Sequence, residues 1–125
     1  MSINEGEIFG LLGPNGAGKT TTINAIIGLT RLDGGEVRIF DKNLATCELE
    51  IKRDIGVVPQ DIAVFDDLTA YENVLFFGKL YGLRDGILKE RVEEALNFTG
   101  LWERRMDFPK KFSGGMKRRL NIACA

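Results

Sequence analysis

Residues 13–20 read Gly-Pro-Asn-Gly-Ala-Gly-Lys-Thr and match the pattern GxxxxGK[ST] at every fixed position. A short apolar run, residues 7–12, precedes the match, and residues 20–27 follow it with a helical pattern. Glycines let the backbone curl so that successive N–H groups point inward, and the helix start behind them adds partial positive charge. The motif therefore predicts a strand–loop–helix unit that cradles the phosphates of a nucleoside triphosphate.

Two side chains of this loop add chemistry that the backbone lacks. Lys19 is a cation that can reach the β- and γ-phosphates, and the Thr20 hydroxyl can ligate Mg²⁺. Glycine is in excess, with 15 of 125 residues, and is clustered, whereas the average is about 7%. The loop alone leaves the use of the nucleotide open, because small-molecule kinases, GTPases and transport ATPases share it.

Composition excludes several other classes of protein. The chain is 44% hydrophobic and 28% charged, which fits one globular domain. It has no histidine, so a Ser-His-Asp triad or a histidine zinc site is excluded within it. No apolar run reaches the roughly 18 residues of a membrane helix and the start is acidic, so we expect a cytosolic protein with free thiols at Cys47 and Cys124.

Charge is unevenly distributed along the chain. Residues 108–125 carry five Lys or Arg and no Asp or Glu, although the formal net charge of the whole chain is −1. Such a block can attract phosphate or an acidic partner, or form the solvated face of a helix. Because the block is short, we do not expect nucleic-acid binding.

The remaining elements follow from periodicity and capping signals. Strands are expected at residues 7–12, 36–40 and 55–59, and short helices at residues 20–27 and 48–53. Thr69 and Glu72 form a capping box that predicts a helix to about Tyr81. Asp85 is expected to cap a second helix, which ends near Gly100. Its apolar face is expected to comprise Leu88, Val92, Ala95 and Leu96.

A second glycine pair stands at the expected start of the last helix. Ser113 is the expected cap, and Gly114 and Gly115 follow it, so several N–H groups are exposed at the positive end of the helix dipole. Each glycine costs the helix about 0.8–1.0 kcal/mol relative to alanine. This start is a second candidate phosphate site, and an ordinary N-cap with incidental glycines is the alternative.

Three ordered motifs together resemble the ATP-binding subunit of an ABC transporter. They are the loop at 13–20, Val58-Pro59-Gln60, and Phe112-Ser113-Gly114-Gly115. In that family these are the Walker A loop, the Q-loop and the signature motif, in this order. Residues 6–12 and 65–73 look most like multidrug or antibiotic exporters. Phe112 and Met116 stand where Leu and Gln are commoner, and both leave the Ser-Gly-Gly backbone intact.

The resemblance implies a role for each matching residue. The phosphates of ATP and the Mg²⁺ ion would be held by Gly13, Pro14, Asn15, Gly16, Ala17, Gly18, Lys19, Thr20 and Thr21. Thr20 and Gln60 would ligate or approach the metal. Ser113, Gly114 and Gly115 would touch the γ-phosphate of a nucleotide held by an opposing subunit. Lys19, Gln60 and Ser113 would thus serve ATP hydrolysis.

The resemblance also implies a fold and partners. It predicts an α/β P-loop NTPase core, residues 1–66, and an α-helical subdomain with the signature helix, residues 67–125. The implied partners are a membrane-spanning permease and a second ATP-binding subunit. The implied place is the inner face of the cell membrane, reached through the permease, where ATP would drive export of a substrate.

The family's domain continues past the signature helix into the Walker B strand, a catalytic glutamate and a switch histidine, so this chain looks like the domain's first part. The Walker B strand would lie beside residues 8–12, which are therefore expected to have an unpaired apolar edge. We expect phosphate binding without meaningful turnover. The alternative from another class is a non-catalytic nucleotide-binding or interaction module.

Overall fold

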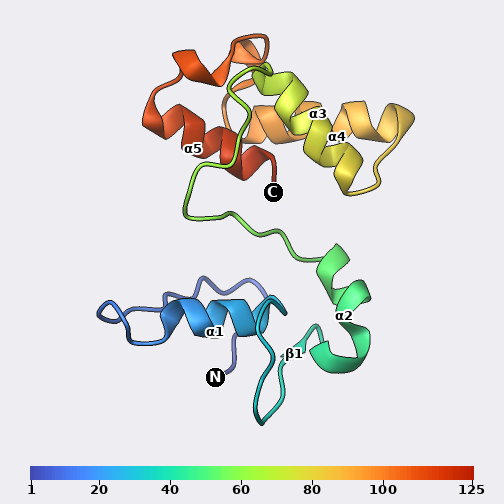
Figure 1. Cartoon of the computed structure of the whole chain (residues 1–125). Helices are drawn as coiled ribbons and strands as arrows, with labels where there is room; N and C mark the ends of the chain where they lie inside the picture. The colour runs from blue at the N-terminus through green and yellow to red at the C-terminus, as the bar shows by residue number, and fades with distance from the viewer. The chain divides into compact units, whose positions relative to one another are not determined.

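The computed structural model describes residues 1–125, and the chain packs as two compact units, Met1–Ile55 and Gly56–Ala125. Figure 1 shows the elements of each unit. The first unit contains α1 (Lys19–Ile26), β1 (Arg38–Ile39), β2 (Lys42–Asn43) and α2 (Leu44–Arg53). The second contains α3 (Ala70–Leu80), α4 (Asp85–Phe98), the 3₁₀ turns η1 (Trp102–Arg104) and η2 (Pro109–Lys111), and α5 (Gly114–Ala123). None of these helices combines the length and apolar character needed to cross a membrane.

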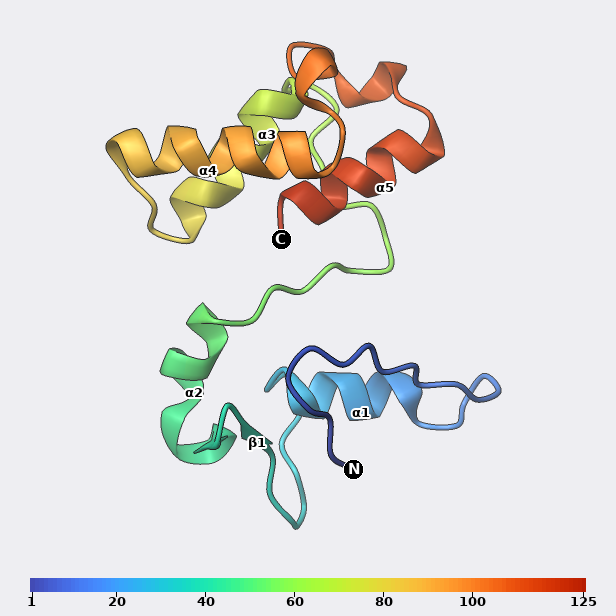
Figure 2. The same ribbon diagram turned by 180° about the vertical axis from the view of Figure 1, so that it is seen from behind.

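Two of the expected strands are wrong. Residues 7–12 and 55–59 form no strand, and the Ile8 and Leu12 side chains are 100% and 94% exposed. The apolar pattern predicts burial, but a strand exists only when a neighbouring strand pairs with its N–H and C=O groups. No other segment of residues 1–125 pairs with either run. In Figures 1 and 2 the N-terminal segment instead runs beside α1 as irregular chain.

The expected strand at 36–40 is shorter than predicted. Arg38 and Ile39 pair antiparallel with Asn43 and Lys42, so the observed sheet is a two-stranded hairpin. Its turn residues Phe40 and Asp41 both have positive φ, as a tight two-residue hairpin turn requires. The element α2 begins earlier than the helix expected at 48–53, at Leu44, where the Asn43 side chain accepts a hydrogen bond from the Ala45 N–H. Cys47 has non-helical angles (φ −121°, ψ 28°) and kinks the element, so the part after the kink agrees with the expected helix.

The helices of the second unit agree with the sequence pattern. The capping box of α3 is present in both directions between Thr69 and Glu72. Leu88, Val92 and Leu96 of α4 are buried against α3 and α5, and Ala95 is partly buried beside them. Asp85 is not the cap that we expected. It is the first residue of α4 and its side chain makes no capping bond, so its carboxylate can only favour the helix dipole.

Asn73 of α3 is the polar centre of this unit. Its side chain is fully buried, and its Oδ1 accepts a hydrogen bond from the Phe65 N–H at 2.8 Å. Its Nδ2 donates to the carbonyls of Phe65, Leu68 and Thr69 at 3.0–3.1 Å. One side chain therefore fixes the turn that leads into α3. Phe65 itself packs edge-on against Phe76, with ring centres 5.2 Å apart.

The capping box makes the stability of the second unit dependent on pH. The Thr69 N–H and then the Thr69 hydroxyl donate to the Glu72 carboxylate, and these bonds lower the pKa of Glu72. The stabilisation is therefore present above about pH 4.5 and is lost as the pH falls through the lowered pKa. We expect Glu72→Gln to reduce the acid dependence of the free energy of unfolding, measured by urea titration between pH 3 and 6. The matched control, Glu90→Gln on the exposed face of α4, should retain the wild-type slope; an equal loss of slope in both variants would contradict this assignment.

Both cysteines are free thiols, as expected. Cys124 is buried in the core of the second unit, and this burial raises the pKa of its thiol to about 12. It therefore stays protonated and acts as a small apolar side chain.

Candidate functional site

The glycine-rich loop of the first unit curls directly into α1. Its Ala17 N–H donates to the Pro14 carbonyl at 3.2 Å, which closes a tight turn. Gly16 and Gly18 have φ values of +83° and +85°, a conformation that residues with side chains rarely adopt. Gly18 is also the N-cap of α1, so its left-handed conformation directly precedes the first helical residue, Lys19.

Most backbone N–H groups of this loop have no acceptor within the protein. These groups belong to Asn15, Gly16, Gly18, Lys19, Thr20 and Thr21. In α3, by contrast, the first N–H groups donate to the carbonyls of Asp107 and Arg105 and to the Thr69 hydroxyl. Exposed donors at the positive end of a helix dipole are what an anion with several oxygens needs.

Lys19 braces the loop and supplies its positive charge. Its Nζ donates to the carbonyls of Gly13 at 2.5 Å and Pro14 at 2.7 Å. An ammonium group has three N–H bonds, so one donor remains for a phosphate oxygen. The loop is compact at this point, because a Cβ at Gly13 would lie 3.3 Å from the Ala17 Cβ.

The hydroxyls after Lys19 differ in their availability. Thr22 donates to the Gly18 carbonyl at 2.9 Å, whereas the Thr20 and Thr21 hydroxyls have no protein partner. No group of three or more His, Cys, Asp or Glu residues is placed to hold a metal ion. A single hydroxyl fits Mg²⁺ that takes its other ligands from nucleotide phosphates and water, which is the usual mode for this ion.

The start of α5 in the second unit is the other exposed set of donors. Ser113 is the N-cap, as expected, and its Oγ accepts a hydrogen bond from the Met116 N–H at 3.2 Å. The N–H groups of Gly114 and Gly115 have no protein acceptor, and both glycines are exposed. Two N–H groups at the N-terminus of α5 are therefore available to an anion.

Gln60 is exposed and lies in the second unit, in the irregular segment before α3. The expected site residues are thus divided: the loop at 13–20 belongs to the first unit, and Gln60 and Ser113 belong to the second. The shared metal site of Thr20 and Gln60 stays a prediction. Sequence reasoning missed Arg118 and Asn121 of α5, which bind the chain on either side of Gln60. The charge pattern of residues 108–125 does not indicate which Lys or Arg side chain makes hydrogen bonds within the protein.

Comparison with known sequences matches the whole chain to one protein family. A family model described as ABC transporter matches residues 1–125. The linearmycin resistance ATP-binding protein LnrL of Bacillus subtilis is 50% identical over 125 residues, which are 100% of this chain and 40% of that protein. The daunorubicin/doxorubicin resistance ATP-binding protein DrrA of Streptomyces peucetius is 38% identical over 100% of this chain and 38% of its own length. The chain therefore spans about 40% of the length of these curated relatives.

The backbone is also similar to a solved structure. A chain described as the structure of an ATP binding subunit of an ABC transporter superposes with a TM-score of 0.71 at 34% sequence identity. The superposition covers 91% of this chain and 48% of that one. The expected fold class, a P-loop NTPase of this type, is confirmed for the part of the domain that the chain contains.

Proposed function

This chain belongs to the ABC transporter family, and from that membership we propose that it is the nucleotide-binding part of an exporter's ATP-binding subunit. Membership implies nucleotide binding. The observation that carries the proposal further is the segment at 13–21, which presents six N–H groups without a protein acceptor and the Lys19 ammonium, held by the carbonyls of Gly13 and Pro14. These donors match the β- and γ-phosphate oxygens of ATP.

Mg²⁺ is proposed as the companion of the nucleotide. Thr20 offers its free hydroxyl, and Gln60 would approach the same ion or the attacking water. When bound, the ion would neutralise charge on the phosphates. Lys19 would hold the phosphates in place, and Thr21 would add a hydroxyl beside them.

The second unit is proposed to act on a nucleotide held by another subunit. Ser113, Gly114 and Gly115 would contact its γ-phosphate through the N–H groups and the hydroxyl at the start of α5. Two copies would then enclose two ATP molecules. For the whole protein we propose that ATP binding and hydrolysis in such a pair, at the inner face of the membrane, drive a permease partner that exports a substrate. The names of two relatives state resistance to linearmycin and to daunorubicin/doxorubicin, and removal of a drug from the cell is one way to resist it, so these names fit export.

The test is a calorimetric titration of the chain with ATP and AMP, with Mg²⁺ and with chelator. We expect AMP to bind at least about tenfold more weakly than Mg·ATP, because it lacks the phosphates that the loop would hold. Thr20→Val should reduce the dependence on Mg²⁺, since it removes the hydroxyl that is the proposed ligand in the loop. The matched control is Thr22→Val, whose hydroxyl is already bonded to Gly18 and should not matter for the ion. AMP binding as tight as Mg·ATP binding would contradict the proposal.

A further inference from the structure

Side chains of α5 attach the segment that carries Gln60. Arg118 Nη1 donates to the Pro59 carbonyl at 2.5 Å and to the Gln60 carbonyl at 3.3 Å. Asn121, almost one turn further along α5, donates to the carbonyls of Pro59 and Asp61 at 3.4 and 3.3 Å. Its Oδ1 accepts a hydrogen bond from the Ala63 N–H at 3.1 Å. Three successive carbonyls are thus bound by one face of α5.

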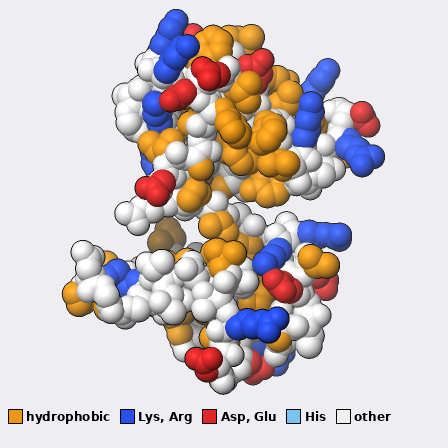
Figure 3. Space-filling model, in the orientation of Figure 1, with side chains coloured by type: hydrophobic (Ala, Val, Ile, Leu, Met, Phe, Trp, Pro, Cys, Tyr) orange, Lys and Arg blue, Asp and Glu red, His pale blue; other side chains and the backbone are white.

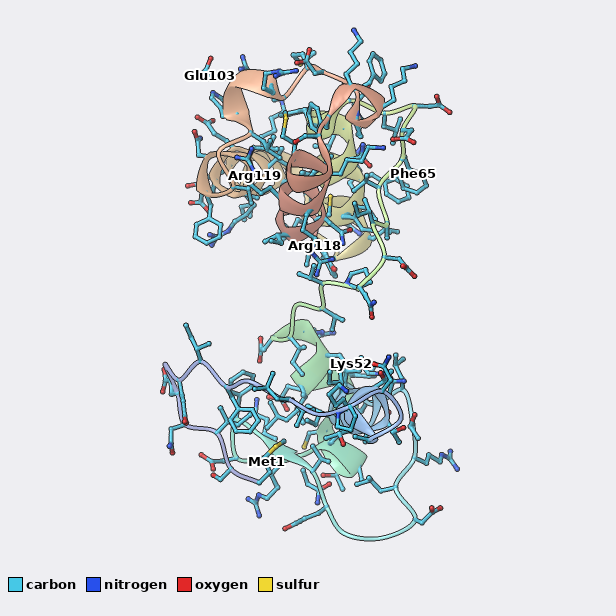
Figure 4. All side chains as sticks on the ribbon, turned by 90° about the vertical axis from the view of Figure 1, so that its left-hand side faces the viewer. Met1, Lys52, Phe65, Glu103, Arg118 and Arg119 are labelled. Carbon is cyan, nitrogen blue, oxygen red and sulfur yellow. The ribbon has the colours of Figure 1, made fainter.

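No backbone–backbone hydrogen bond holds residues 56–62 in place, and these residues form no helix or strand. The order of this stretch therefore depends on the side chains that reach it. Figure 4 shows Arg118 beside this segment, whereas its neighbour Arg119 lies on another side of α5. Arg119 donates to the carbonyls of Thr99 and Gly100 instead.

We propose that Arg118 is a positioning residue that ties Gln60 to the helix opened by Ser113. The proposal rests on the proposed function in taking Gln60 to act at the nucleotide. Arg118 lies five residues after Ser113 on the same helix and binds the carbonyls of Pro59 and Gln60, so a displacement of α5 would carry the Gln60 backbone with it. Arginine suits this task because it stays charged and its rigid planar head holds a fixed direction between two carbonyls.

The experiment is ¹⁵N relaxation on the full chain and its Arg118→Met variant. Met keeps the apolar stem and removes the guanidinium. We expect the order parameters of the Gln60 and Asp61 amides to fall from about 0.85 to below about 0.6 in Arg118→Met. Arg118→Lys should give intermediate values, because an ammonium can still reach one carbonyl. Arg119→Met, the matched control, should leave Gln60 ordered, and Thr99 and Gly100 should also stay ordered because their N–H groups keep their bonds to the carbonyls of Ala95 and Asn97.

A second readout tests positioning for the nucleotide. On addition of Mg·ATP we expect the Gln60 side-chain amide resonance to shift in the wild type and in Arg119→Met, and to stay still in Arg118→Met. Unchanged order at Gln60 in Arg118→Met, or an equal loss in both methionine variants, would overturn the proposal. A Gln60 resonance that ignores Mg·ATP in the wild type would also overturn it. Failure of the proposed function is distinct, because the loop amides of Gly16 and Gly18 would then ignore Mg·ATP in every variant.

Discussion

Replacement of Lys19 by alanine is expected to weaken Mg·ATP binding by about 10- to 100-fold. A hydrogen bond to a charged group contributes about 1.5–3 kcal/mol, which corresponds to that range of affinity. The variant also removes the brace on the carbonyls of Gly13 and Pro14, so the loop loses its shape as well as its charge. Isothermal titration calorimetry measures the change directly.

The control for Lys19 is another lysine of the same unit. Lys52 forms an ion pair with Glu48 at 2.5 Å on α2, and its replacement by alanine removes one lysine side chain from the same unit, as Lys19→Ala does. Lys52→Ala should change the affinity less than about twofold, because exposed ion pairs contribute about 0–1 kcal/mol and none of its contacts is with the loop. Equal losses in the two variants would mean that net charge, rather than the loop, binds the nucleotide.

Asn73→Ala is expected to lower the free energy of unfolding of the second unit by about 2–4 kcal/mol. The substitution leaves the Phe65 N–H and the Leu68 carbonyl without their partner, while the Phe65 carbonyl keeps the hydrogen bond from the Leu68 N–H at 3.3 Å. A buried polar group left unpaired costs about 1–3 kcal/mol, and water recovers part of that cost at this partly exposed turn. Urea unfolding followed by the fluorescence of Trp102, the chain's one tryptophan, reports on this unit.

Asn97 provides the matched asparagine. It is exposed on α4 and donates one hydrogen bond, to the Glu93 carbonyl at 2.9 Å. Asn97→Ala should be neutral or slightly stabilising, since alanine is the better helix former. An Asn73→Ala variant within about 0.5 kcal/mol of the wild type would show that the buried asparagine does not hold the turn into α3.

Local signals account for what the sequence predicts well. The capping box at Thr69 and the apolar spacing of α4 involve residues three or four positions apart, and both are present in the structure. The loop at 13–20 is also local, because its shape depends on two glycines with positive φ. Such features form between residues that are close in the sequence, so they can be predicted without knowing which distant segments pack against them.

Long-range partners account for what the sequence predicts poorly. Residues 7–12 have the pattern of a buried strand, but no segment of the chain pairs with them. The role of Asn73 depends on a turn eight residues away, and Arg118 meets carbonyls almost sixty residues earlier in the chain. The sequence around Asn73 or Arg118 does not indicate which backbone groups the side chain binds.

Hydrophobic side chains remain exposed over parts of both units, as the space-filling view in Figure 3 shows. In the second unit they include Phe76, Leu80 and Tyr81 of α3 and its C-terminal end. The buried core of that unit lies beneath, between α3, α4 and α5. The second unit thus has a hydrophobic core of its own. Its unfolding and the binding of nucleotide by the loop of the first unit can be measured separately.

If the backbone of residues 13–21 holds the phosphates of ATP, an NMR titration of the ¹⁵N-labelled chain with Mg·ATP should show it at those residues. We predict that the amide resonances of Gly16, Gly18, Lys19, Thr20 and Thr21 shift together and saturate with one affinity, and that AMP leaves them unmoved at the same concentrations. Loop resonances that stay in place while Mg·ATP binds elsewhere on the chain would show that this loop does not hold the phosphates.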